Sequence, residues 1–204
     1  MTPELQNQII SKYPNIFKDC SKSPQESCMS FGLEVGDGWF NIIDTLCESL
    51  TYIFTSSVEV DTHDAQRLNI DPITFKGTNY YFHIKPPQVV ADQVKEKFGT
   101  LRFYYHLEFD PVNLDLVNTG KYPSLVDANK SYEDFIRGII HFAETASGRT
   151  CEVTGSAGEL HSRGGWLKVL NSHTAKALDY EPVDYKPKTM SSPIVASWIS
   201  GALD

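Results

Sequence analysis

The stretch that decides the fold reads Leu101-Arg102-Phe103-Tyr104-Tyr105-His106-Leu107-Glu108-Phe109. Its odd-numbered positions are apolar or aromatic and its even-numbered positions are mostly polar, a two-residue period that is typical of a strand with one buried face. Just upstream, Val90, Val94 and Phe98 can share that buried face. We therefore expect a β-hairpin over residues 89–109 at the centre of the fold.

The turn of this hairpin sets its register. Gly99-Thr100 fits a two-residue loop of type II′, which places glycine first. The pairs that follow from this loop are Phe98 with Leu101, Lys97 with Arg102, Lys95 with Tyr104 and Gln93 with His106. The same register leaves Asp92 and Glu96 on the apolar face.

Those two acids keep a second interpretation open for the first half of the hairpin. Val90, Ala91, Val94 and Phe98 also fit the apolar stripe of a helix that ends at Gly99. Short apolar runs do not distinguish a strand from a helix by their pattern alone. The hairpin is the favoured interpretation.

If the hairpin forms, Lys95, Lys97 and Arg102 gather on one solvent-facing side of it. Like charges that face each other in a sheet are destabilising, so something should offset their repulsion. An anionic ligand would do so, and so would an acidic side chain from elsewhere in an acid-rich chain. Tyr104 lies beside these cations and could stack on a base.

Composition restricts the class of protein. The chain has 204 residues and 41% hydrophobic content, enough for one domain with a sizeable core. Its formal net charge of -8 argues against general binding to nucleic acid or to an anionic membrane. The N-terminus lacks the pattern of a secretory signal, and no apolar run is long enough to span a bilayer. Four widely spaced cysteines then favour free thiols in a reducing cytosol.

Helices are expected on both sides of the hairpin in the sequence. Residues 3–12 form a short helix, and residues 39–54 show the three- and four-residue spacing of an amphipathic one. Another amphipathic helix is predicted from the capping residue Ser131 to Gly148. Residues 192–203 form a short terminal helix that can dock on the body or on a second subunit, with Ile194, Val195 and Trp198 on its apolar face.

The turn Gly36-Asp37-Gly38 at the start of the first long helix has two interpretations. Exposed amides at a helix N-terminus bind anions. Asp37 can instead cap the helix, and its carboxylate would then occupy the place of the anion. The cap is favoured, because the turn lacks the longer glycine pattern of phosphate-binding loops.

Four segments resemble those of a family of uncharacterised proteins encoded mainly by tailed bacteriophages and prophages. They lie between residues 36 and 170 and read Gly36-Asp37-Gly38-Trp39-Phe40, Gln93-Val94-Lys95-Glu96-Lys97-Phe98-Gly99-Thr100-Leu101-Arg102-Phe103-Tyr104, Arg149-Thr150-Cys151-Glu152-Val153 and Gly164-Gly165-Trp166-Leu167. The resemblance implies no activity that can be carried over.

The resemblance does imply a structural zinc site of ribbon or treble-clef type, with a Cys-x-x-Cys knuckle beginning at Cys151 and a second pair of ligands after the Gly-Gly-Trp segment. This chain departs from that pattern, since Thr154 stands at the second thiolate and Asn171 stands near the third ligand. Only Cys151 with His161 or His173 is left, whereas a structural zinc needs four ligands. We therefore expect no metal, a knuckle held by packing and hydrogen bonds, and Trp166 in its core.

No catalytic residue emerges from the sequence. Cys151 with His161 or His173 is the one couple that could form a nucleophile and its base, and no third orienting group stands out. We expect no cofactor and lean towards a protein that is not an enzyme. Arg163, on the glycine-rich approach to Trp166, is a further cation that could contact an anion.

These observations together predict an α+β fold. We expect a small antiparallel sheet with a central hairpin, covered by two amphipathic helices. It belongs to a single domain at residues 1–179, which includes a degenerate zinc-ribbon-like lobe at residues 149–179. A tail at residues 180–204 follows the domain. The expected function is that of a non-enzymatic phage accessory protein that binds a host component in the host cytosol, as a monomer or a homo-oligomer. An anionic nucleotide-type defence signal is the expected ligand, at Lys95, Lys97, Arg102, Tyr104 and Arg163. The alternatives are a nucleic-acid-associated module derived from a zinc finger and an inhibitor that binds a host protein.

Overall fold

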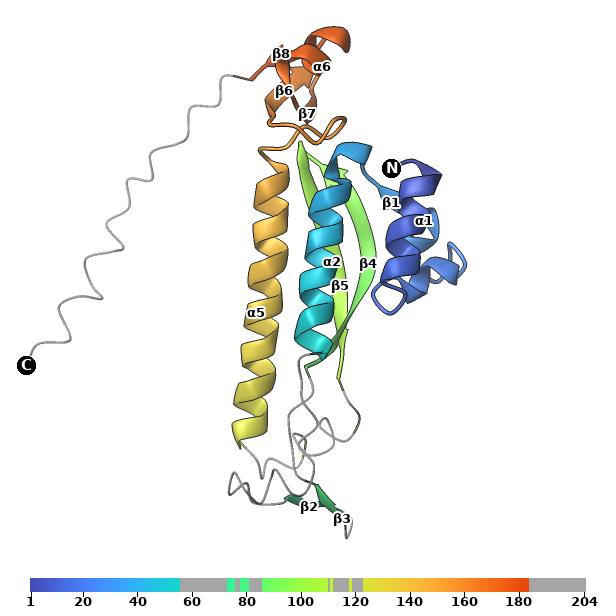
Figure 1. Cartoon of the computed structure of the whole chain (residues 1–204), viewed down its shortest axis with the longest axis vertical. Coiled ribbons are helices and arrows are strands. Elements are labelled where there is room, and N and C mark those ends of the chain that lie inside the picture. Colours follow the sequence, from blue (N-terminus) through green and yellow to red (C-terminus); the bar gives the residue numbers. More distant parts are fainter. Residues whose placement is uncertain are drawn as a thin grey trace, which may run out of the picture.

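The chain adopts an α+β fold with two three-stranded sheets and three main helices (Figure 1). The computed structural model describes residues 1–55, 73–75, 78–80, 86–109, 111, 118 and 123–183. The main helices are α1 (Pro3–Lys12), α2 (Phe40–Thr55) and α5 (Pro123–Ser147). None of the described helices is both long enough and apolar enough to cross a membrane. The helix predicted for residues 192–203 lies outside the described residues.

The main sheet contains the predicted hairpin. Its strand order is β1 (Leu33–Glu34), β4 (Gln88–Lys97) and β5 (Thr100–Glu108). The strand interpretation is confirmed for residues 89–97, and the helical alternative is wrong. β1 joins β4 in parallel, so the sheet is mixed rather than wholly antiparallel as predicted. A separate pair of short strands, β2 (Ile73–Phe75) and β3 (Thr78–Tyr80), makes a two-stranded sheet.

The predicted register of the hairpin is wrong by two residues. The turn residues are Phe98 and Gly99, with φ of 56° and 79°. Positive φ at both central positions defines a type I′ turn, which matches the twist of the two strands. Consequently Lys95, not Lys97, lies opposite Arg102. Phe98 is 67% exposed, so it does not join the buried face.

A β-bulge at Asp92 reverses the sides of the sheet to which the side chains in the first part of β4 point. Ala91 pairs with Tyr105 and Gln93 pairs with Tyr104, so Asp92 is an extra residue in β4. Before the bulge, Val90 turns to the opposite side from Val94, yet it is fully buried there. The bulge thus takes Asp92 off the apolar face where the sequence pattern had placed it.

The apolar face of the hairpin packs against α2 and α5, as predicted. Val94, Leu101 and Phe103 share one buried cluster with residues of both helices, among them Ile43 and Ile136. In Figure 1 the two helices run side by side along the strands. α5 begins at Pro123, eight residues before the predicted cap at Ser131, so the helix start predicted from the capping pattern is wrong.

Side chains of α5 protect the free edge of β5. The Ser147 hydroxyl oxygen accepts a hydrogen bond from the Leu101 amide at 2.8 Å, and a Glu144 carboxylate oxygen accepts one from the Phe103 amide at 3.0 Å. An exposed strand edge is a template for pairing with another chain. These two contacts close part of that edge to such pairing.

Two short 3₁₀ helices lie against β4. The 3₁₀ helices η1 (Lys18–Ser21) and η2 (Cys28–Phe31) pack against β4, and the Ala91 amide donates to the Ile16 carbonyl at 2.8 Å. Nearer the turn, Lys95, Arg102 and Tyr104 lie on the face of the hairpin opposite to Val94 and Leu101.

A small lobe follows α5. It contains β6 (Glu159–Arg163), β7 (Trp166–Leu170), α6 (Ser172–Ala177) and β8 (Glu181–Pro182), and its sheet has the order β7-β6-β8. The lobe has its own buried cluster, formed by Cys151, Leu170, Ala175 and Tyr180. Trp166 is 75% exposed, so the prediction of a core position for it is wrong: it stands at the start of β7 beside the turn formed by Gly164 and Gly165.

The Gly36-Asp37-Gly38 turn seats this lobe on the body. The Gly38 amide donates to the Glu152 carbonyl at 2.8 Å, and the Trp39 indole nitrogen donates to the Thr150 carbonyl at 2.9 Å. A Cβ at position 38 would lie 2.2 Å from the Cys151 carbonyl oxygen. The turn is therefore a contact surface for the lobe. The prediction that Asp37 caps the helix is wrong. Asp37 lies within the 3₁₀ helix η3 (Asp37–Trp39), and its carboxylate accepts a hydrogen bond from the Thr2 amide.

The tip of the hairpin meets the same lobe. Gly99 packs so closely that a Cβ there would lie 2.5 Å from the Leu160 side chain. Three of the segments that carry the family resemblance, around Gly38, Gly99 and Cys151, therefore meet at one junction between body and lobe. Their glycines are explained by close packing at this junction.

Candidate anion-binding site

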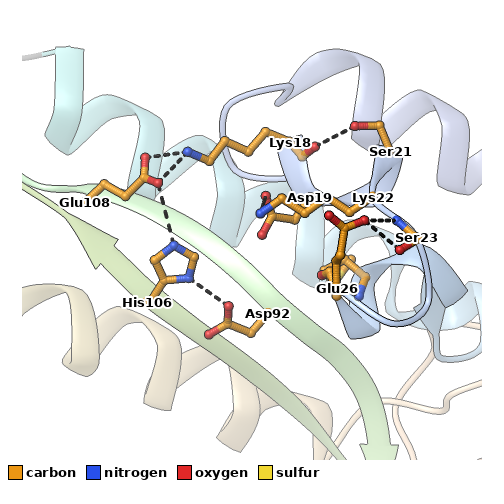
Figure 2. A network of polar contacts seen from close by, with 11 residues as sticks. Lys18, Asp19, Ser21, Lys22, Ser23, Glu26, Asp92, His106 and Glu108 are labelled. Atoms are coloured by element: carbon orange, nitrogen blue, oxygen red, sulfur yellow. Dashed lines mark hydrogen bonds and ion pairs between the residues drawn. The ribbon is translucent and has the colours of Figure 1, made fainter.

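The polar face of the hairpin divides into two parts, and acids neutralise the bases in the first. His106 Nδ1 lies 2.7 Å from an Asp92 carboxylate oxygen, and Lys18 Nζ lies 2.5 Å from a Glu108 carboxylate oxygen. Figure 2 shows both contacts. The hydrogen bond from Lys18 lowers the pKa of the Glu108 carboxyl below its usual value. Asp92 reaches His106 because the bulge turns it to this side. Charges in this part are therefore paired, and the sequence pattern gave no sign of the His106 pair.

The second part, nearer the turn, carries three cations and the ring of Tyr104, together with the uncharged Gln93 and Thr100. We call Lys95, Lys97, Arg102 and Tyr104 the cationic strip. Lys95 lies directly opposite Arg102, the arrangement of like charges that destabilises a sheet. Within the described part of the chain, none of the three cations forms an ion pair with a carboxylate. The strip is thus a local excess of positive charge in a chain with a net charge of -8.

The two acids nearest to the strip are engaged elsewhere. Glu34 lies beside Lys95 in the register between β1 and β4, but its carboxylate accepts from the Gln93 side-chain amide at 3.2 Å. Glu96 caps the turn, where its carboxylate accepts from the Gly99 amide at 2.6 Å. Neither acid forms an ion pair with the strip, but Glu34 remains its acidic neighbour in the register.

The strip is partly preorganised by contacts among its own members. Lys95 Nζ lies 5.4 Å from the centroid of the Tyr104 ring, a cation–π geometry. An Arg102 nitrogen donates to the Thr100 hydroxyl at 2.7 Å and to the Leu101 carbonyl at 2.8 Å. These contacts hold the guanidinium close to the strand and occupy one of its nitrogens. The remaining donors of Arg102 and the ammonium of Lys95 can bind an anion together with the 42% exposed Tyr104.

Arg163 is not brought together with the strip by any contact among the described residues. One of its guanidinium nitrogens donates to the Leu178 carbonyl at 2.8 Å, and the group lies 4.9 Å from the centroid of the Tyr180 ring. Both partners belong to the lobe. Arg163 thus serves the packing of the lobe around β8, and its predicted role at the anion site stays a prediction.

In the lobe, hydrogen bonds surround Cys151. The Thr154 hydroxyl accepts from the Asn171 amide nitrogen at 2.9 Å, and the Asn171 side-chain oxygen accepts from the Thr174 amide at 2.8 Å. Burial by itself would raise the pKa of the Cys151 thiol. Hydrogen bonds from the Thr154 hydroxyl and from the amides of Asn171, Thr154 and Val153 outweigh burial and lower that pKa.

Cys151 and His161, one of the couples considered from the sequence, are both buried in the lobe. Cys151 is fully buried, and the buried His161 directs its Nδ1 at the Glu159 carbonyl at 2.7 Å. Across the described ranges, no three residues of the types His, Cys, Asp and Glu come together as a metal site. A thiol, a hydroxyl and an amide that bind one another do not supply the four nitrogen or sulfur ligands of a structural zinc.

Sequence reasoning missed one further feature, a groove between α2 and α5. Phe135 and Phe142 are 58% and 75% exposed along it. Their seven-residue spacing, with Gly138 between them, places both rings on one side of α5 and could have indicated the groove. Large aromatic residues in an amphipathic helix are, however, usually assigned to its buried face.

Comparison of the chain with protein-family models, with curated proteins and with solved structures finds no match.

Proposed function

We propose that the protein is a non-enzymatic binding protein whose cationic strip holds an anionic ligand of nucleotide type. One observation supports this most strongly: Lys95 and Arg102 face each other across the strands with no carboxylate partner among the described residues. A bound phosphate would convert that repulsion into two charge-assisted hydrogen bonds. Tyr104 would stack on a base, a contribution of about 1 to 3 kcal/mol.

The wider setting follows from the family resemblance. In this proposal the protein is an accessory protein of a tailed bacteriophage that acts in the host cytosol and sequesters a nucleotide signal of host defence. Sequestration needs no chemistry, which agrees with a strip of cations and an aromatic ring that offers no general base. An inhibitor that binds a host protein is the alternative within the same class.

The experiment is a titration of the full chain with ATP, GTP and a cyclic dinucleotide, followed by calorimetry at low and at high salt. The test variant combines Lys95→Ala, Lys97→Ala and Arg102→Ala. The matched control combines substitutions to Ala at three exposed cations outside the strip, namely Lys130, Arg149 and Lys176. Both variants have the same net charge, so general attraction to anions is equal in the two.

The expected result is that at least one nucleotide binds the wild type and the control equally. The strip variant should bind it at least about a hundredfold more weakly, since it loses two hydrogen bonds to charged groups that are each worth about 1.5 to 3 kcal/mol. The strip variant should also unfold at the same or a higher urea concentration, because it relieves like-charge repulsion. Equal binding by the strip variant and the control would refute the site.

We also propose that the lobe descends from a zinc knuckle. Cys151 stands in a turn closed by Gly155, with φ of 75°, and the hairpin β6–β7 leads to α6, whose N-cap is Asn171. Treble-clef sites take their ligands from such a turn and from the first turn of such a helix. This arrangement favours a second candidate, a nucleic-acid-associated module. Binding of a single-stranded oligonucleotide that weakens steeply with salt, and that survives in the strip variant, would support this second function.

A further inference from the structure

The groove between α2 and α5 is an apolar surface without an occupant among the described residues. It has a volume of about 600 Å³, and Asp134 is the only charged residue that lines it. Phe135 and Phe142 line it from α5, and Ile42 lines it from α2. A large exposed apolar patch on a folded protein commonly marks a place where another segment binds.

Gly138 gives the groove its depth. It lies in α5 between the two phenylalanines, and no atom lies within 4 Å of the position that its Cβ would occupy. Glycine inside a helix weakens that helix relative to alanine, so its presence is unfavourable for α5 alone. The open space at Gly138 is large enough to receive part of a bulky side chain from an approaching helix.

The chain itself contains a segment with the matching chemistry. Residues 189–203 carry no charged side chain, although 22% of the whole chain is charged. Ile194, Val195, Trp198 and Ile199 recur at the spacing of one helical face, and Pro193 suits a first helical position. An apolar segment without charged side chains fits a mostly apolar groove in which Asp134 is the only charged lining residue.

The length of the chain allows this segment to reach the groove. The Val183 amide donates to the Leu160 carbonyl, so the described chain ends in the lobe, which lies at the C-terminal end of α5 (Figure 1). Residues 184–192 can span up to about 30 Å when extended. A helix over 193–203 is about 16 Å long, close to the roughly 18 Å of α5 between Asp134 and Ala146 that line the groove.

We propose that residues 193–203 form a helix that occupies the α2–α5 groove of the same chain. It enters at the end near Ala146 and runs antiparallel to α5, which places Trp198 near the space at Gly138. Attachment nine residues away gives the segment a high effective concentration at the groove, so docking needs no second molecule.

Hydrogen–deuterium exchange on the full chain tests this proposal. Gly138→Leu fills the space that Trp198 requires, and Trp198→Ser removes the ring itself. Thr145→Leu is the matched control, because it adds a leucine to an exposed position of α5 outside the groove. Peptides from β4 and β5 report whether each variant keeps the fold.

In the wild type, amides of residues 194–203 should exchange at least about tenfold more slowly than an unstructured chain, independently of protein concentration. Gly138→Leu and Trp198→Ser should abolish this protection while β4 and β5 stay protected, and Thr145→Leu should retain it. Unprotected tail amides in the wild type would overturn the proposal. Protection that appears only at high concentration, together with a dimer in light scattering, would assign the groove to a second copy and would also overturn it.

Discussion

Replacing Gly38 by alanine tests how the lobe is seated on the body. The added Cβ would lie 2.2 Å from the Cys151 carbonyl oxygen and 2.4 Å from the Gly155 nitrogen. Both are backbone atoms, which cannot rotate aside as the end of a side chain can. The lobe must therefore move away from the turn.

The cost follows from the contacts that this movement breaks. The hydrogen bond from the Gly38 amide to the Glu152 carbonyl is worth about 1 kcal/mol. The indole nitrogen of the fully buried Trp39 would lose the Thr150 carbonyl, and an unpaired buried donor costs about 1 to 3 kcal/mol. We expect Gly38→Ala to lower the free energy of unfolding by about 2 to 4 kcal/mol.

Urea denaturation followed by circular dichroism measures this loss, and the chain offers a matched control. Gly138→Ala makes the same chemical change at a helical position where nothing lies within 4 Å of the new Cβ. It should raise the free energy of unfolding by about 0.5 to 1 kcal/mol. If Gly38→Ala instead unfolds within about 0.5 kcal/mol of the wild type, the junction can admit a Cβ and the reasoning about the lobe is refuted.

Three further predictions concern other parts of the structure. Ser147→Ala leaves a free-edge amide of β5 without its acceptor, so urea denaturation should show a loss of about 1 to 3 kcal/mol, and no loss would refute the edge contact. Iodoacetamide should label the exposed Cys28 in the native protein and spare the buried Cys151 despite its lowered thiol pKa; mass spectrometry showing Cys151 labelled first would contradict its burial. Glu108→Gln should destabilise by less than about 1 kcal/mol at pH 7, because the pair with Lys18 is exposed. The lowered pKa of Glu108 means that its stabilisation is present above the unfolded pKa and is lost as pH falls through the folded pKa. Wild type and variant should therefore converge once the pH lies below the folded pKa, and a difference that persists there would exclude this pair as its source.

The hairpin could be predicted because apolar and polar residues alternate along residues 101–109, and this alternation follows the buried and exposed faces of a strand. The register could not, since Phe98 occupies a left-handed conformation that favours glycine. The error was two residues, and a shift of two keeps each side chain on its face whereas a shift of one reverses it. For this reason the members of the cationic strip were predicted correctly as one face although their partners were not.

Other features depend on tertiary contacts that no local pattern carries. The bulge at Asp92 and the burial of Val90 on the polar side of the hairpin are two such features, and the alternation of side chains indicates neither. Gly38 looked like a loop glycine, but its role is set by Cys151, which lies far away in the sequence. Trp166 has a large apolar side chain of the kind that usually lies in a core, yet its place beside the Gly164–Gly165 turn leaves it exposed.

The most direct test of the cationic strip is native mass spectrometry of the full chain purified gently at low salt. The account predicts that the wild type and the control variant retain an anionic ligand of a few hundred daltons, which is lost on denaturation. The variant with Lys95, Lys97 and Arg102 replaced by alanine should have the mass of the bare chain. A bare wild-type chain, or the same added mass on the strip variant, would contradict the proposed site.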